Sequence, residues 1–124
     1  MNPDKTKSGS LSGSVIFFSL LVIAGMAAGL AAASGTQKFT GVITDSMCAD
    51  ADHSRMRMGP TDAECARACN DDHGAPYVLY DGKIVYSLSD QKAPEKFAGQ
   101  KVTVTGALDT KSSTIQVDSI ASAK

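Results

Sequence analysis

The segment YVLYDGKIVYSL, Tyr77–Leu88, decides the fold because it has the pattern of a β-hairpin. Its two halves, Tyr77–Tyr80 and Lys83–Leu88, are rich in the β-branched and aromatic residues that favour strands. Between them lies Asp81-Gly82, a dipeptide typical of the tight turns that join antiparallel strands. The segment therefore predicts two neighbouring strands of an antiparallel sheet.

Three further segments on either side of this hairpin have strand patterns. Phe39–Asp45 is rich in β-branched residues, while Lys101–Gly106 and Thr114–Ile120 alternate polar and apolar residues, so that one face is buried. Asp90–Phe97 is expected to be a short helix or loop, and Asp109–Ser113 a turn. Five short antiparallel strands with a helical element between the third and fourth predict a mostly β fold, a small five-stranded OB-like barrel. An open α+β sheet with the same elements is the alternative.

A long segment, 46–76, separates the first expected strand from the hairpin. Its first part, up to Thr61, has no clean period and is expected to be a loop. Thr61 followed by Glu64 matches the S/T-x-x-E capping box, and Gly74 is placed to end a helix that runs to about Asp72. We therefore expect a helix-containing insertion over 46–76, between strands 1 and 2.

The first 33 residues differ in composition from the rest of the chain. Val15–Ala33 carries no charged side chain, follows Lys5 and Lys7, and ends in an A-x-A sequence. This pattern is typical of a secretory signal peptide. The alternative is an N-terminal membrane anchor, because a helix of this length measures about 28 Å, close to the hydrocarbon core of about 30 Å.

The expected organisation is a signal peptide over 1–33, a linker over 34–38 and an OB-like domain over 39–124. The domain is expected to be exported to the periplasm or the extracellular space. If the leader is retained, the protein is instead anchored in the inner membrane and faces the periplasm.

Composition excludes several classes of function. The chain has 12 Lys and Arg against 13 Asp and Glu, a net charge of −1, so it does not bind nucleic acid through bulk positive charge. A domain this short buries only about 60–65% of its unfolded surface, which excludes a multidomain enzyme. The sequence contains no C-x-x-C pair, no G-x-S-x-G and no H-E-x-x-H, and we therefore expect no catalytic activity.

Every cysteine and histidine of the chain lies in one short segment, together with three of the five methionines. These residues are Met47, Cys48, His53, Met56, Met58, Cys65, Cys69 and His73. Cys65, Cys69 and His73 recur every fourth residue and so follow one face of the expected helix. Thiolate and imidazole are ligands of zinc and copper, and thioethers add affinity for Cu(I). The candidate ligands of a zinc or copper ion are therefore Cys48, His53, Cys65, Cys69 and His73.

A disulfide is the alternative interpretation, because paired cysteines in exported proteins usually form one. A bond from Cys48 to Cys65 or Cys69 would tie the loop to the helix and contribute about 3 kcal/mol. Three cysteines cannot all pair within one monomer, so one remains a free thiol, a metal ligand or half of an intermolecular bridge.

Three functions follow from these interpretations. The first is a non-catalytic module that captures a soft metal ion, the second a disulfide-stapled domain that binds an envelope protein without metal, and the third a thiol redox protein. The expected partner is thus a metal ion or an envelope protein. Nucleic acid is not expected, and the membrane is a partner only if the leader is retained.

Several segments resemble a family of small exported bacterial proteins of unknown function. The segments are GVITDSMC at 41–48, His53, DAECARAC at 62–69, Tyr77-Val78-Leu79 and Val85-Tyr86. The resemblance covers about Phe39 to Ile120, and D-S-M-C and C-x-x-x-C are its most specific parts. The region Phe97–Ile120 also resembles the last strands of bacterial periplasmic OB-fold proteins. The resemblance implies export and an OB-like architecture and leaves the function open.

Overall fold

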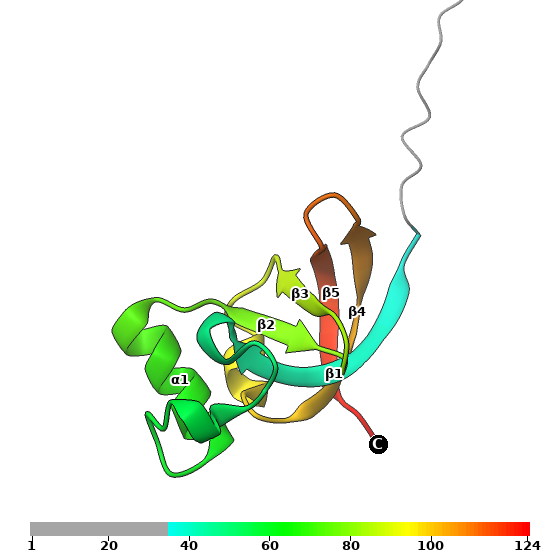
Figure 1. The fold of residues 1–124 in the computed structure, drawn as a ribbon. Coiled ribbons are helices and arrows are strands. Elements are labelled where there is room, and N and C mark those ends of the chain that lie inside the picture. Colours follow the sequence, from blue (N-terminus) through cyan, green and yellow to red (C-terminus); the bar gives the residue numbers. More distant parts are fainter. Residues whose placement is uncertain (1–34) are drawn as a thin grey trace, which may run out of the picture. The chain divides into compact units, whose positions relative to one another are not determined.

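The structure is a computed structural model that describes residues 35–124, and in this part the chain is mostly β (Figure 1). The expected leader over 1–33 lies outside the described residues. Among residues 35–124, no helix is long and apolar enough to cross a membrane. The strands are β1 (Gln37–Asp45), β2 (Tyr77–Tyr80), β3 (Val85–Leu88), β4 (Lys101–Asp109) and β5 (Thr114–Ser122). The helical elements are α1 (Asp62–His73) and the short 3-10 helices η1 (Ser46–Cys48), η2 (His53–Arg55) and η3 (Pro94–Phe97).

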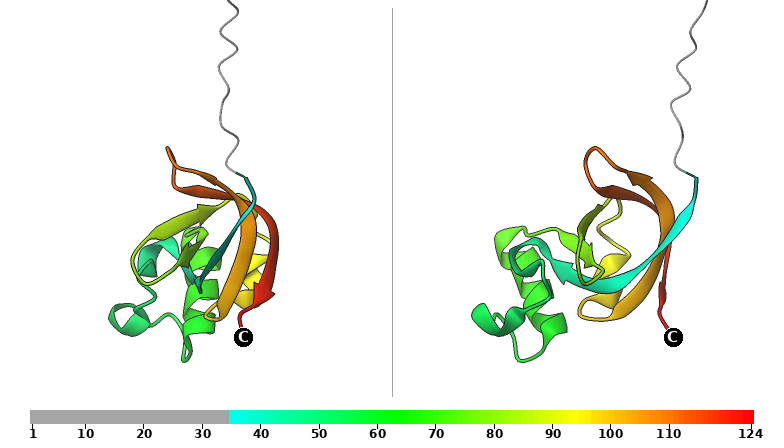
Figure 2. Two further views of the ribbon diagram at one scale, coloured as in Figure 1. Left: turned by 90° about the vertical axis from the view of Figure 1, so that its right-hand side faces the viewer. Right: turned by 45° about the vertical axis from the view of Figure 1, so that its right-hand side comes forward.

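The five strands form one sheet that closes into a ring (Figure 2). Their order is β1-β2-β3-β5-β4, and β4 pairs again with β1. β1 contacts both neighbours because it is long, and Val42 pairs with Lys101 on one side and with Tyr80 on the other. The prediction of a mostly β, five-stranded fold is thus confirmed, and the alternative of an open sheet is not observed.

One strand pair differs from the expected antiparallel arrangement. β3 and β5 run parallel, with Ser87 opposite Thr114 and Leu88 opposite Ile115. The β4–β5 hairpin turns the chain back so that β5 enters the ring beside β3 in the same direction. The prediction of five wholly antiparallel strands was therefore wrong at this pair.

The interior of the ring is filled by the apolar faces of the strands. Along β4, Val102 and Val104 are fully buried while Thr103 and Thr105, which alternate with them, are half-buried, as the alternation predicted. The other buried large side chains of this core are Ile43, Tyr77, Leu79, Tyr86, Leu88 and Ile115. These residues make the ring a rigid support for the segment inserted between β1 and β2.

Four strand boundaries differ from the expected ones. β4 and β5 extend beyond the expected Gly106 and Ile120 to Asp109 and Ser122. β1 begins at Gln37, inside the expected linker, because that residue still pairs with β4. β3 begins at Val85 because the carboxylate of Asp81 accepts hydrogen bonds from the backbone N–H groups of Lys83 and Ile84, which belong to the turn. The turn therefore lies where Asp81 and Gly82 predicted it but is longer than two residues.

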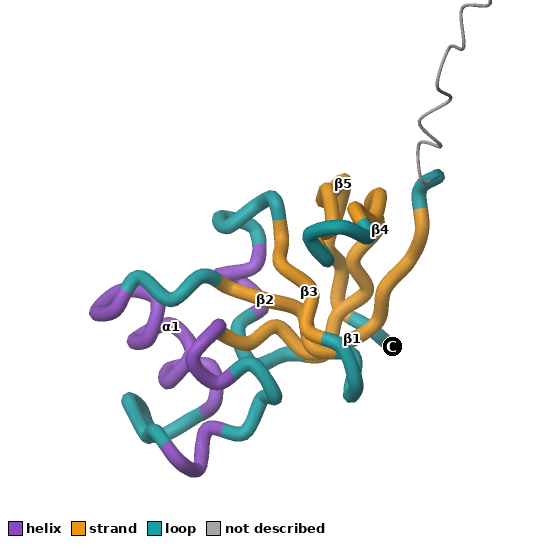
Figure 3. The backbone as a smooth tube through the Cα atoms, turned by 45° about the horizontal axis from the view of Figure 1, so that its top comes forward, coloured by secondary structure: helices purple, strands orange, loops and turns teal. Residues whose placement is uncertain are grey.

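Helix α1 has the expected boundaries. The Thr61 hydroxyl accepts a hydrogen bond from the Glu64 backbone N–H and donates one to the Glu64 carboxylate. Gly74 ends the helix with a φ of 64°, a left-handed conformation that glycine adopts without strain. The segment before the helix is not wholly loop, since it contains η1 and η2. Figure 3 shows these helical elements gathered at one side of the strands, and α1 contacts β1.

Gly41 tests how tightly β1 is held in the ring. A Cβ added at this position would overlap the backbone of Tyr80 on the paired strand, whereas one added at Gly35 would meet nothing within 4 Å. We expect Gly41→Ala to lower the free energy of unfolding by about 1–3 kcal/mol, because the clash is with backbone that cannot rotate away. Urea denaturation measures this change. Gly35→Ala is the matched control, and equal stability of the two variants would contradict the strand packing.

Candidate metal centre

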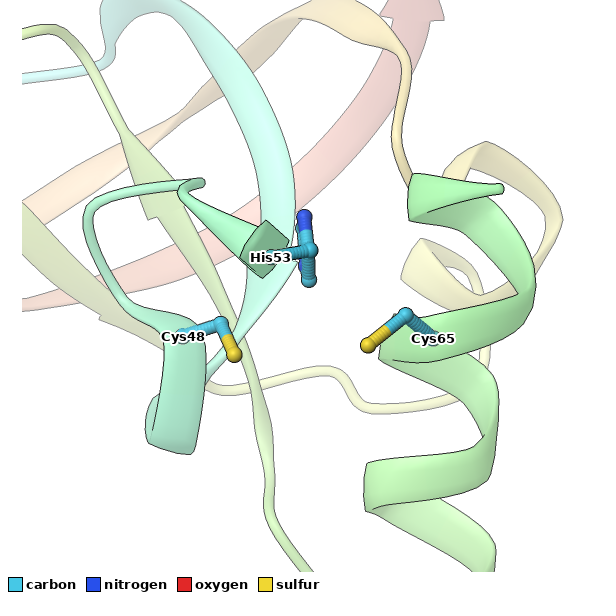
Figure 4. Close-up of side chains that lie close together, drawn as sticks. All are labelled: Cys48, His53 and Cys65. Carbon is cyan, nitrogen blue, oxygen red and sulfur yellow. The ribbon is translucent and has the colours of Figure 1, made fainter. Parts of the chain in front are cut away.

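Three of the expected ligands meet at one point beside the ring. Cys48 ends η1, His53 begins η2 and Cys65 lies in the first half of α1. One donor atom from each, the two Sγ atoms and a ring nitrogen, lie within 4.8 Å of one another. The three side chains are buried, with exposed fractions of 3%, 5% and 1%. Figure 4 shows the two sulfur atoms facing each other, with the imidazole ring beside them.

The end of β1 positions Cys48. Asp45, the last residue of the strand, is fully buried and caps η1: its Oδ1 atom accepts hydrogen bonds from the backbone N–H groups of Met47 and Cys48, both at 2.9 Å. The Thr44 hydroxyl donates to the carbonyl oxygen of Cys48 at 2.7 Å. The backbone of Cys48 is thus fixed to the ring by two neighbouring side chains.

The same two residues orient His53. Its Nε2 atom lies 3.2 Å from the Thr44 hydroxyl and 3.5 Å from Oδ2 of Asp45. The Thr44 hydroxyl already donates its proton to the Cys48 carbonyl. It can therefore only accept a hydrogen bond from His53, which places a proton on Nε2. Nδ1, on the other side of the ring, lies 3.4 Å from Oδ1 of Asp62.

Two buried polar atoms of this centre have no hydrogen-bond partner among residues 35–124. They are Oδ2 of Asp45 and Nδ1 of His53. A buried carboxylate without compensation is costly, and such charges are normally paired or bound to a metal. A cation bound close to this oxygen would offset that cost.

Backbone groups of the preceding loop hold Cys65. Its Sγ atom donates a hydrogen bond to the carbonyl of Met56 at 2.8 Å and accepts one from the N–H of Met58 at 3.3 Å. The side chains of these two methionines are partly exposed, at 36% and 37%. The methionines thus contribute to the centre through their backbone.

The other two expected ligands lie outside this group. Cys69 is fully buried one turn after Cys65 and packs with it and with Ala75. His73 is exposed in the last turn of α1, where a cation suits the negative end of the helix. Of the three residues expected on one face of the helix, Cys65 and Cys69 are thus buried together, whereas His73 is exposed. The structure brings together Cys48, His53 and Cys65 and leaves His73 apart.

Burial raises the pKa of two of the three thiols. Desolvation, with Asp45 nearby, raises the pKa of the Cys48 thiol. The same causes raise the pKa of Cys69 to about 12. All three cysteines are unpaired in this structure. A metal that binds here must therefore displace protons from thiols, as is usual for thiolate sites.

Sequence reasoning missed Thr44 and Asp45 as parts of the centre. Both lie at the end of an expected strand, and the β-branched residues that predicted that strand give no reason to expect a buried carboxylate. The one available signal is the spacing of Asp45 from Cys48, because an aspartate can cap a turn that begins just after it. That signal predicts a cap and not the contact with His53.

Comparisons with known proteins found no match, whether to family models, to curated proteins or to solved structures.

Thiol accessibility tests the burial of the three cysteines. In the folded, metal-free, reduced protein at pH 8, we expect iodoacetamide to alkylate Cys48 and Cys69 much more slowly than a free thiol, because both are buried with a raised pKa. Mass spectrometry of timed samples measures the rates. Unfolding in guanidinium should expose three reactive thiols. Rapid alkylation of Cys69 in the folded protein would contradict its placement.

Proposed function

We propose that this chain is an exported, non-catalytic binding module that captures a soft metal ion, zinc or copper, through Cys48, His53 and Cys65. The observation that carries the proposal is the convergence of these three donors within 4.8 Å. They come from three separate elements, η1, η2 and α1, and the first two of these are short 3-10 helices. Export is supported by the sequence pattern over 1–33.

The distances suit a metal better than a direct sulfur–sulfur bond. Zinc binds sulfur at about 2.3 Å and imidazole nitrogen at about 2.0–2.1 Å, so two sulfurs around a tetrahedral ion lie about 3.8 Å apart. Donors within 4.8 Å need to close by at most about 1 Å. The donor set of two thiolates and one imidazole fits zinc or copper and leaves a further coordination position open.

The residues around the donors support the same proposal. Metal-binding histidines usually donate a hydrogen bond from their second ring nitrogen to a carboxylate, a backbone carbonyl or water, and this bond fixes the orientation of the ring. Asp45 and Thr44 supply such partners at Nε2 of His53. A metal bound beside them also compensates the orphaned oxygen of Asp45.

For the scaffold we propose an OB-like barrel. The ring order β1-β2-β3-β5-β4 and the short helix η3 between β3 and β4 support this architecture. The insertion between β1 and β2 carries all three donors, so the barrel serves as support and the insertion carries the function.

A disulfide-stapled interaction domain is the second candidate. The observation in its favour is that the sulfur atoms of Cys48 and Cys65 are within 4.8 Å, so that a modest movement would allow a bond of about 2.05 Å. This bond would use two of the three proposed ligands and leave Cys69 as the odd thiol. The two candidates therefore exclude each other in any one molecule.

The two histidines provide a matched test of the metal site. We expect the reduced protein to bind one Zn²⁺ or Co²⁺. His53→Ala should weaken binding by more than about 100-fold, because loss of a metal ligand should lower the affinity more than loss of a residue that only hydrogen-bonds a ligand. His73→Ala, which removes the exposed histidine, should leave affinity unchanged. Competition titration with a chromophoric chelator measures both.

Free-thiol counting and elemental analysis of the exported protein complete this test. One bound metal with three thiols alkylatable after its removal would support the proposal. Two blocked thiols and no stoichiometric metal would overturn it in favour of the staple. Equal losses of affinity in the two histidine variants would overturn the assignment of His53 as a ligand.

Asp45 gives a second prediction. Asp45→Asn keeps an oxygen that can accept from Met47 and Cys48 but removes the charge beside His53. We expect metal affinity to fall about 10–100-fold, the range typical for removing a residue that hydrogen-bonds a metal ligand. The same titration measures it, with circular dichroism to verify folding. Asp50→Asn, a nearby exposed aspartate, is the control, and an unchanged affinity in Asp45→Asn would contradict the role of this carboxylate.

A further inference from the structure

A cavity of about 240 Å³ lies against one of the three proposed ligands. It is bordered by His53, by the start of α1 at Thr61 and Asp62, and by Asp52 and Arg57 of the preceding loop. Neither Cys48 nor Cys65 borders it. Since about 10–15 Å³ is enough for one water molecule, the cavity has room for a small hydrated ion.

The two thiols are nearly closed to solvent. Cys48 and Cys65 have exposed fractions of 3% and 1%, so a metal ion does not reach them directly from outside. His53 is different because it contributes both to the donor group and to the wall of the cavity. The imidazole ring is therefore the link between the cavity and the buried sulfur atoms.

The wall of the cavity carries the groups that would receive a cation. Nδ1 of His53 is buried and has no hydrogen-bond partner in the described part of the chain, and Oδ1 of Asp62 lies 3.4 Å from it. An imidazole nitrogen and a carboxylate oxygen at this separation form a two-donor site for a divalent ion such as zinc. Asp52 adds negative charge at the same cavity, and Arg57 opposes it.

We propose that this cavity is the access route of the metal, and that Asp62 together with Nδ1 of His53 first captures the hydrated divalent ion before it passes to the thiols. The inference rests on the proposed function, because it describes how the same centre is loaded. Asp62 acts on the rate of capture, and the thiols and His53 determine the final affinity. Capture by fixed charge is also expected to weaken as salt screens it.

The test measures association and dissociation of Co²⁺ by stopped-flow absorption in the reduced protein at low ionic strength. Asp62→Asn is expected to slow association about 3–10-fold and to slow dissociation by the same factor, so that the equilibrium constant changes less than twofold. Glu64→Gln is the matched control: it removes one charge from the same helical turn, but Glu64 does not border the cavity. Arg57→Gln should speed association.

The outcomes separate this inference from the proposed function. If the wild-type protein binds neither Co²⁺ nor Zn²⁺ at equilibrium, the proposed function fails and the access route fails with it. If the wild type binds but Asp62→Asn associates as fast as Glu64→Gln, only the access route is overturned. If Asp62→Asn instead binds Co²⁺ more weakly because the ion dissociates faster, the access route is likewise overturned, since Asp62 would then be part of the final centre.

Discussion

The buried carboxylate of Asp45 is the constraint on which the insertion depends. One of its oxygens caps η1 by accepting two backbone hydrogen bonds, and the other faces the ring of His53. Because Asp45 ends β1, these contacts fix the start of the insertion to the rigid ring. They also determine where Cys48 and His53 lie relative to each other. A single side chain thus makes the end of a strand one side of the candidate metal centre.

The other side of that site has little apolar support. Only three side chains of α1 are buried, those of Cys65, Ala66 and Cys69, and two of them form a small cluster with Ala75. Burial of such small side chains contributes far less than burial of leucine or phenylalanine. Apolar burial therefore contributes little to holding the helix. A bond through the sulfur atoms, to a metal or to each other, would add a further long-range link.

Much of this arrangement follows from local sequence rules. The helix boundaries at Thr61 and Gly74 come from capping chemistry, and the strands from alternation, so both were predictable. The parallel pair of β3 with β5 was not, because strand direction within a closed ring depends on the path of the whole chain. The clustering of cysteine and histidine predicted the region of the site. It did not separate His53 from His73, since that difference arises from the fold of the loop, which has no period.

The burial of the thiols also bears on which bond forms between them. Exchange of thiols with disulfides needs an accessible thiolate, and Cys48 is buried, with its pKa raised by desolvation and by Asp45. The folded, reduced protein is therefore slow to oxidise, even in an oxidising compartment. An unfolded chain has exposed thiols and no such protection. It follows that a disulfide between these cysteines would form before the insertion folds onto Asp45, whereas the folded, reduced protein keeps both thiols and can still be tested for metal uptake.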